Sequence, residues 1–101
     1  MTNNEPQPYT AEEVRQKMLS LMRAYIGVWL KEDRATERER MEGLVFSILN
    51  IFDGTTPDLP AMDIVLRPHP DNRQFAIDEG ERWYEDGMVI NDCLLHEEWH
   101  K

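Results

Sequence analysis

Residues 96–100, His-Glu-Glu-Trp-His, come closer to a catalytic pattern than any other stretch of the chain. They match the zinc-protease motif H-E-x-x-H, in which two histidines on one helical face bind zinc and the glutamate acts as general base on a bound water. His96 and His100 would then be zinc ligands, and Glu97 the base. Cys93 stands three residues before His96 and would continue the same stripe as a third ligand, which leaves one zinc position for water.

The position of this motif favours a different interpretation. It ends one residue before the end of the sequence, where helices fray, and no residues follow that could supply the downstream third ligand of ordinary zinc proteases. We therefore expect an amphipathic C-terminal helix that packs through Leu94, Leu95 and Trp99 and holds no cofactor. A zinc-dependent hydrolase is the alternative.

A second group of candidate residues begins at His69. This histidine stands between Pro68 and Pro70, so a stiff segment would position its ring either for acid–base or ligand chemistry or for a hydrogen bond to a neighbouring carboxylate. Five carboxylates follow it: Asp78, Glu79, Glu81, Glu85 and Asp86. They could include an acid–base pair or a divalent-ion site, but their spacing does not match a calcium-binding loop. Neither Ser47 nor Cys93 has the surroundings of a nucleophile.

Two helices are expected in the first half of the chain, over residues 10–31 and 36–53. Each begins with a capping box, a threonine (Thr10 or Thr36) followed three residues later by a glutamate. Apolar residues recur at helical spacing through both segments, and Gly54 supplies the left-handed residue at which many helices stop. The short connection makes the two helices antiparallel neighbours.

A small antiparallel sheet is expected in the second half. Residues 62–67 are a short apolar run with β-branched members, which is typical of a strand. The Asp86-Gly87 pair predicts a tight hairpin turn between residues 83–85 and 88–90, because both residues tolerate the positive φ that such a turn requires. Residues 62–67 and 82–91 would together supply the sheet.

Two short helices complete the expected fold, one over residues 71–79 that is capped by its first residue, and a C-terminal one capped by Asn91 or Asp92. The predicted fold class is therefore α+β, an antiparallel helical hairpin packed with a small antiparallel sheet and a short C-terminal helix. Residues 1–9 are polar and predict a disordered tail, and residues 10–101 predict a single domain.

Negative charge is concentrated in the second half of the chain. The 101 residues carry 11 Lys and Arg against 20 Asp and Glu, a net charge of −9. Residues 1–50 hold seven basic and eight acidic residues, which gives −1, and residues 51–101 hold four and twelve, which gives −8. Such a surface repels phosphate backbones and anionic headgroups, which disfavours nucleic acid and membranes as partners. It is either a solvated face or a docking surface for a basic protein.

The single cysteine bears on the cellular compartment in which the chain is expected. Cys93 has no partner for an internal disulfide, which fits a reducing cytoplasm. No apolar run approaches the roughly 20 residues of a membrane helix, and the first residues lack the basic start and apolar stretch of a secretory signal. We therefore expect a cytoplasmic protein.

Six stretches of the last two thirds of the chain form a recognisable set: residues 40–49 (RMEGLVFSIL), Asp53-Gly54, Leu59-Pro60-Ala61, Pro68-His69-Pro70-Asp71, Gly80-Glu81-Arg82-Trp83-Tyr84 and Leu95-His96-Glu97. In this pattern, GLxFSIL…DG…LP…PHPxD…GExWY…LHE over residues 38–98, the chain resembles a family of small bacterial proteins of unknown function. The resemblance implies a compact domain. It also directs attention to polar residues near turns as a possible functional surface: His69, Asp71, Glu81, Trp83, His96 and Glu97.

The first predicted helix carries two apolar stripes, one of Val14, Met18, Leu21, Met22, Tyr25 and Trp29, the other of Leu19, Ile26 and Leu30. One partner helix and one sheet would not cover both stripes, so we expect a homodimer that buries the second; alternatively the C-terminal helix covers it within one chain. Gly27 costs this helix about 1 kcal/mol relative to alanine, which indicates close packing there. The function we expect is that of a small, acidic, non-enzymatic interaction or regulatory protein.

Overall fold

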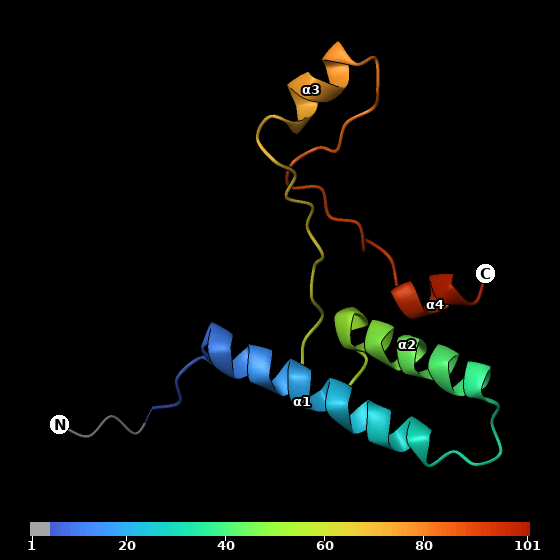
Figure 1. Cartoon of the computed structure of the whole chain (residues 1–101). Helices are drawn as coiled ribbons and strands as arrows, with labels where there is room; N and C mark the ends of the chain where they lie inside the picture. Colours follow the sequence, from blue (N-terminus) through green and yellow to red (C-terminus); the bar gives the residue numbers. More distant parts are fainter. Residues whose placement is uncertain (1–4) are drawn as a thin grey trace.

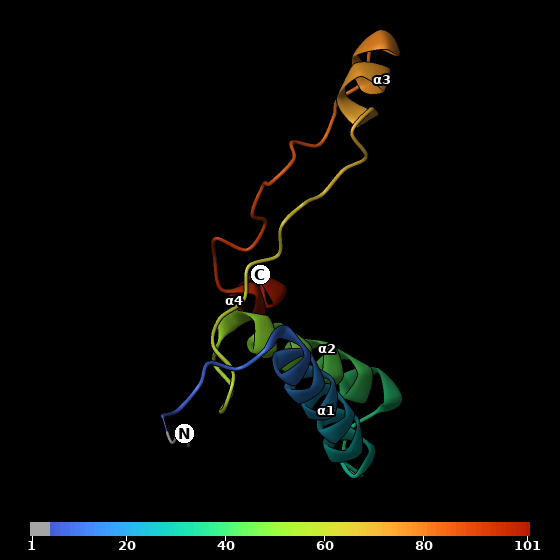
Figure 2. The same cartoon turned by 90° about the vertical axis from the view of Figure 1, so that its left-hand side faces the viewer.

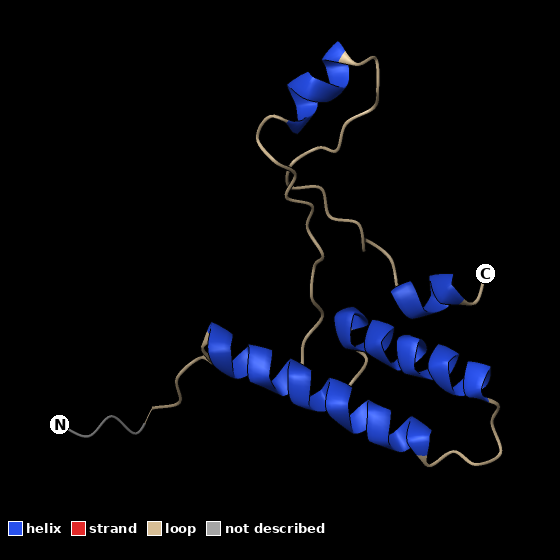
Figure 3. Cartoon of the chain, viewed as in Figure 1, coloured by secondary structure: helices blue, strands red, loops and turns tan. Residues whose placement is uncertain are grey.

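The predicted helical pair is confirmed. The computed structural model describes residues 5–101, in which helix α1 (Ala11–Leu30) and helix α2 (Glu37–Asp53) lie side by side (Figures 1 and 3). Both capping boxes are formed, at Thr10 and at Thr36, with the two reciprocal hydrogen bonds present in each. These boxes satisfy amide groups that the first turn of a helix leaves without an intrahelical acceptor.

The stretch before α1 was predicted as a tail. Residues 5–9 are exposed and form neither helix nor strand. Residues 1–4, the rest of that predicted tail, lie outside the described residues. Regular structure thus begins at the first capping threonine, where the sequence pattern places it.

The close approach between α1 and α2 lies at Gly43. The indole of Trp29 rests on this glycine so closely that a Cβ there would stand 2.5 Å from two of the ring carbons. The indole nitrogen also donates a hydrogen bond of 3.0 Å to the hydroxyl of Ser47, one turn further along α2. A Cβ at Gly27 would meet nothing within 4 Å, so the prediction of close packing there is wrong. The position that requires glycine is therefore Gly43 on α2, and not Gly27 on α1.

The chain turns back at the end of α2. Gly54 ends the helix with φ of 74°, in the left-handed region that favours glycine, and a Cβ there would stand 2.5 Å from the backbone nitrogen of Ala61. Ile51 and Leu59 are buried at this turn, and the amide of Met62 donates to the carbonyl of Phe52 at 2.9 Å. The segment that follows α2 is thereby fixed against its last turn.

Residues 62–91 leave the helical pair as a long arm. Both views show the arm pointing away from α1 and α2, with the short helix α3 (Asn72–Asp78) at its far end (Figures 1 and 2). Two extended segments, residues 64–66 and 87–90, run antiparallel along its middle, and we call them the arm ribbon. Three backbone hydrogen bonds of 2.9–3.0 Å join them, around one isolated bridge between Val65 and Val89.

The predicted antiparallel sheet is therefore wrong, and so is the α+β fold class: residues 5–101 contain helices and one isolated bridge, and no strand (Figure 3). A turn forms at Asp86-Gly87, but the predicted hairpin is wrong, because residues 87–90 bond to residues 64–66 and not to residues 83–85. Residues 83–85 continue into the loop that follows α3. Two segments joined by three hydrogen bonds, with no third strand beside them, do not build a sheet.

Asn91 closes the base of the arm and does not cap the last helix. Its side chain is buried, accepts a hydrogen bond of 2.7 Å from the amide of Ile64 and donates one of 2.6 Å to the carbonyl of Met62. Helix α4 (Leu95–Trp99) begins four residues later and packs against α2. The predicted capping role of Asn91 is wrong because its amide group has a partner on the opposite segment, 27 and 29 residues away.

The chain has a small core for its length. The radius of gyration is 18.7 Å, whereas a compact domain of 100 residues has about 13 Å. Among the described residues, only Ile51, Leu59 and Ala76 are buried hydrophobic residues, and α1 contributes none. The helical spacing of α2 and the apolar run at residues 62–67 predict six further side chains inside, and these are half-buried: Phe46, Ile48, Leu49, Phe52, Ile64 and Leu66. No helix within residues 5–101 is long and apolar enough to cross a membrane.

Candidate functional site

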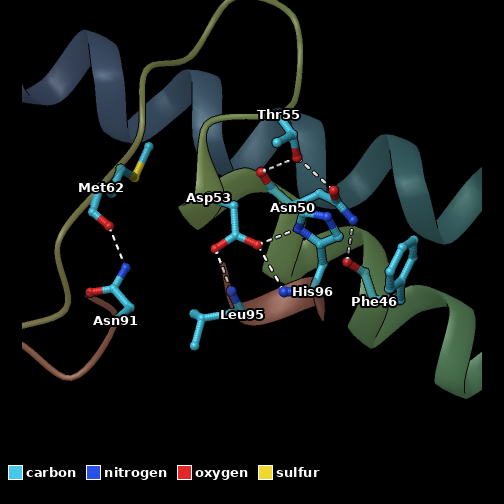
Figure 4. A network of polar contacts seen from close by, with 8 residues as sticks. All are labelled: Phe46, Asn50, Asp53, Thr55, Met62, Asn91, Leu95 and His96. Atoms are coloured by element: carbon cyan, nitrogen blue, oxygen red, sulfur yellow. Dashed lines mark hydrogen bonds and ion pairs between the residues drawn. The ribbon is translucent and has the colours of Figure 1, made fainter. Parts of the chain in front are cut away.

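A buried carboxylate joins the end of α2 to the start of α4. The side chain of Asp53 is fully buried, and its Oδ1 accepts a hydrogen bond of 2.7 Å from the amide of Leu95 (Figure 4). Its Oδ2 accepts one of 2.8 Å from the amide of His96 and lies 2.6 Å from Nδ1 of the same residue. One aspartate thus holds both the first turn of α4 and the imidazole of His96.

Asp53 replaces the local cap that α4 lacks. Leu94 precedes the helix and has no polar side chain, so the free amides of the first turn need an acceptor from elsewhere. Burial of the Asp53 carboxyl raises its pKa, but the hydrogen bonds from the amide and ring of His96 and from the amide of Leu95, with the charge of His96, lower it more. The pKa of Asp53 therefore lies below its usual value, and the group is a carboxylate at neutral pH.

The residues of the H-E-x-x-H motif have different surroundings in the structure. Phe46 of α2 lies between the two histidines, with ring centroids 5.7 Å from His96 and 4.9 Å from His100. Nδ1 of His96 faces Asp53, and Glu97 is exposed. Within residues 5–101 no group of three or more His, Cys, Asp and Glu side chains is placed to hold a metal ion. The zinc centre of the alternative hypothesis, a zinc-dependent hydrolase, stays a prediction.

Cys93 is a free, exposed thiol just before α4. Partial desolvation raises the pKa of Cys93, and the carboxylates of Glu98, Asp92 and Asp53 raise it further. The thiolate, which is the form that attacks electrophiles and binds metals, is therefore disfavoured at neutral pH. This environment is the opposite of the one that activates a catalytic cysteine.

Two of the four polar residues that the resemblance singled out on the arm share a hollow. His69 and Trp83 line a cavity of about 610 Å³ beside the loop that follows α3, together with Arg67, Pro68, Pro70, Arg73, Tyr84, Glu85 and Asp86. The guanidinium of Arg73 lies 5.4 Å from the Trp83 ring centroid, and the Trp83 indole donates to Glu85 at 3.0 Å. The sequence analysis missed Arg73. Its contact with Trp83 becomes visible only when α3 and the loop that follows it are placed side by side.

Asp71 and Glu81 have other positions. The amide of Asp71 donates to Nδ1 of His69 at 3.1 Å, and the Asp71 carboxylate lies 3.8 Å from the same nitrogen. Its side chain makes no capping hydrogen bond to α3, so the predicted cap is wrong, and its backbone is already helical there. Glu81 follows the turn at the end of α3, and its amide donates to the carbonyl of Ala76 at 2.8 Å. Neither carboxylate lines the hollow.

Comparison with protein-family models, with curated proteins and with solved structures found no match to this chain. The resemblance to a family of small bacterial proteins over residues 38–98 is therefore still a prediction. The arrangement of the side chains carries the functional argument that follows.

Proposed function

We propose that this chain is a small, non-enzymatic interaction protein that binds a basic partner protein through the tip of its arm. We call residues 67–86 the arm tip; it carries six acidic and three basic residues, a net charge of −3. Every residue from 77 to 90 is exposed, and the tip projects away from the helical pair (Figure 2). This exposed acidic projection is the observation that carries the proposal, since acidic surfaces attract basic partners and speed their association.

Aromatic side chains supply the second requirement of a binding surface. Trp83 and Tyr84 are exposed at the tip, where Arg73 stacks on the Trp83 ring. Tryptophan, tyrosine and arginine are the residues that contribute most often to binding energy at protein interfaces. Phe75 on α3 is 64 % exposed and adds a third ring to the tip. An interaction surface of aromatic anchors within a charged rim fits these residues better than a catalytic centre does.

The test is retention of a partner from the native host. The chain is coupled to a matrix through its single thiol, Cys93, which is exposed and lies outside the arm tip, two residues before α4. A tip variant (Glu79→Gln, Glu81→Gln and Glu85→Gln) is compared with a body variant of equal charge (Glu12→Gln, Glu32→Gln and Asp33→Asn). We expect a basic protein that binds the wild type and the body variant, elutes with salt and is retained at least tenfold less by the tip variant. Equal retention by the tip variant, or retention insensitive to salt, would falsify the proposal.

A cytoplasmic location belongs to this proposal. Cys93 is exposed and unpaired, and such a thiol stays reduced in a reducing compartment. The alternative function, a zinc-dependent hydrolase built on His96, Glu97 and His100, has no specific observation in its favour, because Asp53 already accounts for the position of His96.

A further inference from the structure

Within residues 5–101, no other helix covers one face of α1. Among the helices, α1 packs against α2 alone, and α4 packs on α2, so the C-terminal helix does not cover the second apolar stripe of α1. None of the 20 residues of α1 is buried, and Ile26 and Leu30 are 47 % and 66 % exposed. Of the stripe that the sequence predicted to need a cover, Leu19 is half-buried, and the end with Ile26 and Leu30 lies open.

An apolar groove occupies the end of the helical pair next to the connecting loop. It has a volume of about 330 Å³ and is lined by Ile26, Trp29, Leu30, Glu37, Arg40, Met41 and Leu44. Met41 on its rim is 67 % exposed. We call these seven residues the helix groove. A concave apolar surface with a few charged groups at its edge is typical of a binding site for apolar side chains.

The arm ribbon also exposes apolar side chains that nothing in the described chain covers. Its apolar side chains are open on both faces, with Val65 and Val89 on one and Met88 and Ile90 on the other, and Val65 and Ile90 are 49 % and 48 % exposed. The hydrogen bonds between the two segments leave the outer edges without backbone partners. An isolated two-stranded ribbon is marginally stable in water at best, and packing against a helix is one of the ways to stabilise it.

The area involved matches that of a stable dimer. The chain exposes 8505 Å², whereas a compact monomer of 12.0 kDa exposes about 6,000 Å². The excess is about 2,500 Å² per chain, and obligate homodimers bury about 2,000–5,000 Å² in total. Residues 5–9, which are exposed, contribute to the excess, as do the arm and the open face of α1.

We propose that two copies of this chain form a reciprocal dimer in which the arm ribbon of each protomer lies across the helix groove of its partner. Charge favours this arrangement over contact between the two arms. Residues 62–91 carry seven acidic and three basic residues, a net charge of −4, so two arms repel each other. The helix groove contains one acidic and one basic residue, Glu37 and Arg40, so it carries no net charge that would repel an arm. The proposal uses the middle of the arm and leaves the arm tip accessible to a separate partner.

The first test is the molar mass and its response to one added charge. Sedimentation equilibrium on the full wild-type chain should give twice 12.0 kDa at micromolar concentration. Val89→Glu in the ribbon and Ile26→Glu in the groove should each halve that mass. Ser20→Glu is the matched control, since it adds the same charge to an exposed position of α1 that does not line the helix groove, and it should leave the mass unchanged. A wild-type mass of 12.0 kDa up to 100 µM (roughly a hundredfold above the working range) overturns the proposal.

The second test mixes the two defective chains. In the reciprocal dimer, Ile26→Glu retains an intact ribbon and Val89→Glu retains an intact groove, so an equimolar mixture regains one of the two arm–groove contacts. We expect the mixture to form a dimer of twice the chain mass, which neither variant forms alone. If a variant unfolds when it is monomeric, the mixture should also regain its helical circular dichroism. A mixture that stays at 12.0 kDa overturns the arm–groove arrangement.

The outcome is separable from that of the proposed function. The tip variant keeps the ribbon and the groove, so it should remain dimeric while it loses the basic partner. A wild-type monomer that still retains such a partner overturns the dimer alone. A dimer that retains none overturns the proposed function alone.

Discussion

Asp53 and His96 meet across 43 residues of sequence, with 2.6 Å between Oδ2 of the aspartate and Nδ1 of the histidine. The same carboxylate also accepts the amides of Leu95 and His96. A negative charge at the last residue of α2 faces the negative end of that helix's own dipole, which is unfavourable. The amides in the first turn of α4, which have no acceptor within their own helix, offset this cost, so the two helices stabilise each other through one side chain.

Replacing Asp53 with alanine should detach α4 from α2. The substitution leaves two amides of α4 and the His96 ring without their acceptor, and each unsatisfied buried group costs about 1–3 kcal/mol. We expect the free energy of unfolding in urea to fall by about 2–4 kcal/mol. Asp33→Ala, at an exposed aspartate in the loop between α1 and α2, is the control and should change it by less than about 0.5 kcal/mol.

The contribution of Asp53 should disappear in acid. Its pKa is lowered in the folded chain, so the stabilisation is present above the pKa of the unfolded state, about 3.9, and is lost as the pH falls through the lower folded value. Urea titrations from pH 5 to pH 2 should therefore show the difference between wild type and Asp53→Asn shrinking below about pH 4. A difference that grows with acidity would contradict the lowered pKa. Glu13 and Glu39 also have lowered pKa values, from the capping hydrogen bonds, and they cancel in this comparison.

Two glycines of the helical pair should respond in opposite directions to alanine. Gly27→Ala has open space around the new methyl group and should stabilise the chain by up to about 1 kcal/mol through helix propensity. Gly43→Ala gains the same propensity but pushes a Cβ into the Trp29 ring, and overpacking of this kind costs about 1–3 kcal/mol. Thermal unfolding of the two variants side by side measures the contrast. A lower midpoint for Gly27→Ala would mean that this face of α1 is covered in solution.

The zinc content of the purified chain tests the alternative hypothesis of a zinc-dependent hydrolase. We expect less than one zinc per chain after purification in EDTA-free buffer, because no third protein ligand joins His96 and His100 within the described residues. Carboxylates often support metal-binding histidines in the way that Asp53 supports His96, so the measurement is informative. Stoichiometric zinc that is lost in His96→Ala would instead favour the zinc-dependent hydrolase over the interaction protein.

The helices could be predicted from the sequence where their signals are local. Thr10 and Thr36 each have their glutamate three residues later, and Gly54 directly follows Asp53, the last residue of α2. A cap of this kind is decided by the next few residues of the chain, and tertiary contacts do not compete with it.

The sheet and the site depend on partners that the sequence does not place next to each other. The amide of Gly87 has its acceptor 21 residues away at Leu66, so the segment after the Asp86-Gly87 turn pairs with residues 64–66 and not with residues 83–85. Asp53 gave no signal as a cap because the helix it caps begins 42 residues later. The glycine pattern misled for a similar reason: Gly43 and Gly27 look equivalent in a helix, and only the position of Trp29 separates them.

The three tryptophans lie in three separate parts of the molecule. Trp29 lies between α1 and α2, Trp83 is on the arm tip beside Arg73, and Trp99 is at the end of α4. Indole emission shifts to longer wavelength as the ring enters water, so a chain that keeps only one of the three reports on one part alone. Fluorescence of such single-tryptophan chains can then follow, in separate recordings, the opening of the helical pair, the engagement of the arm and the release of the C-terminal helix.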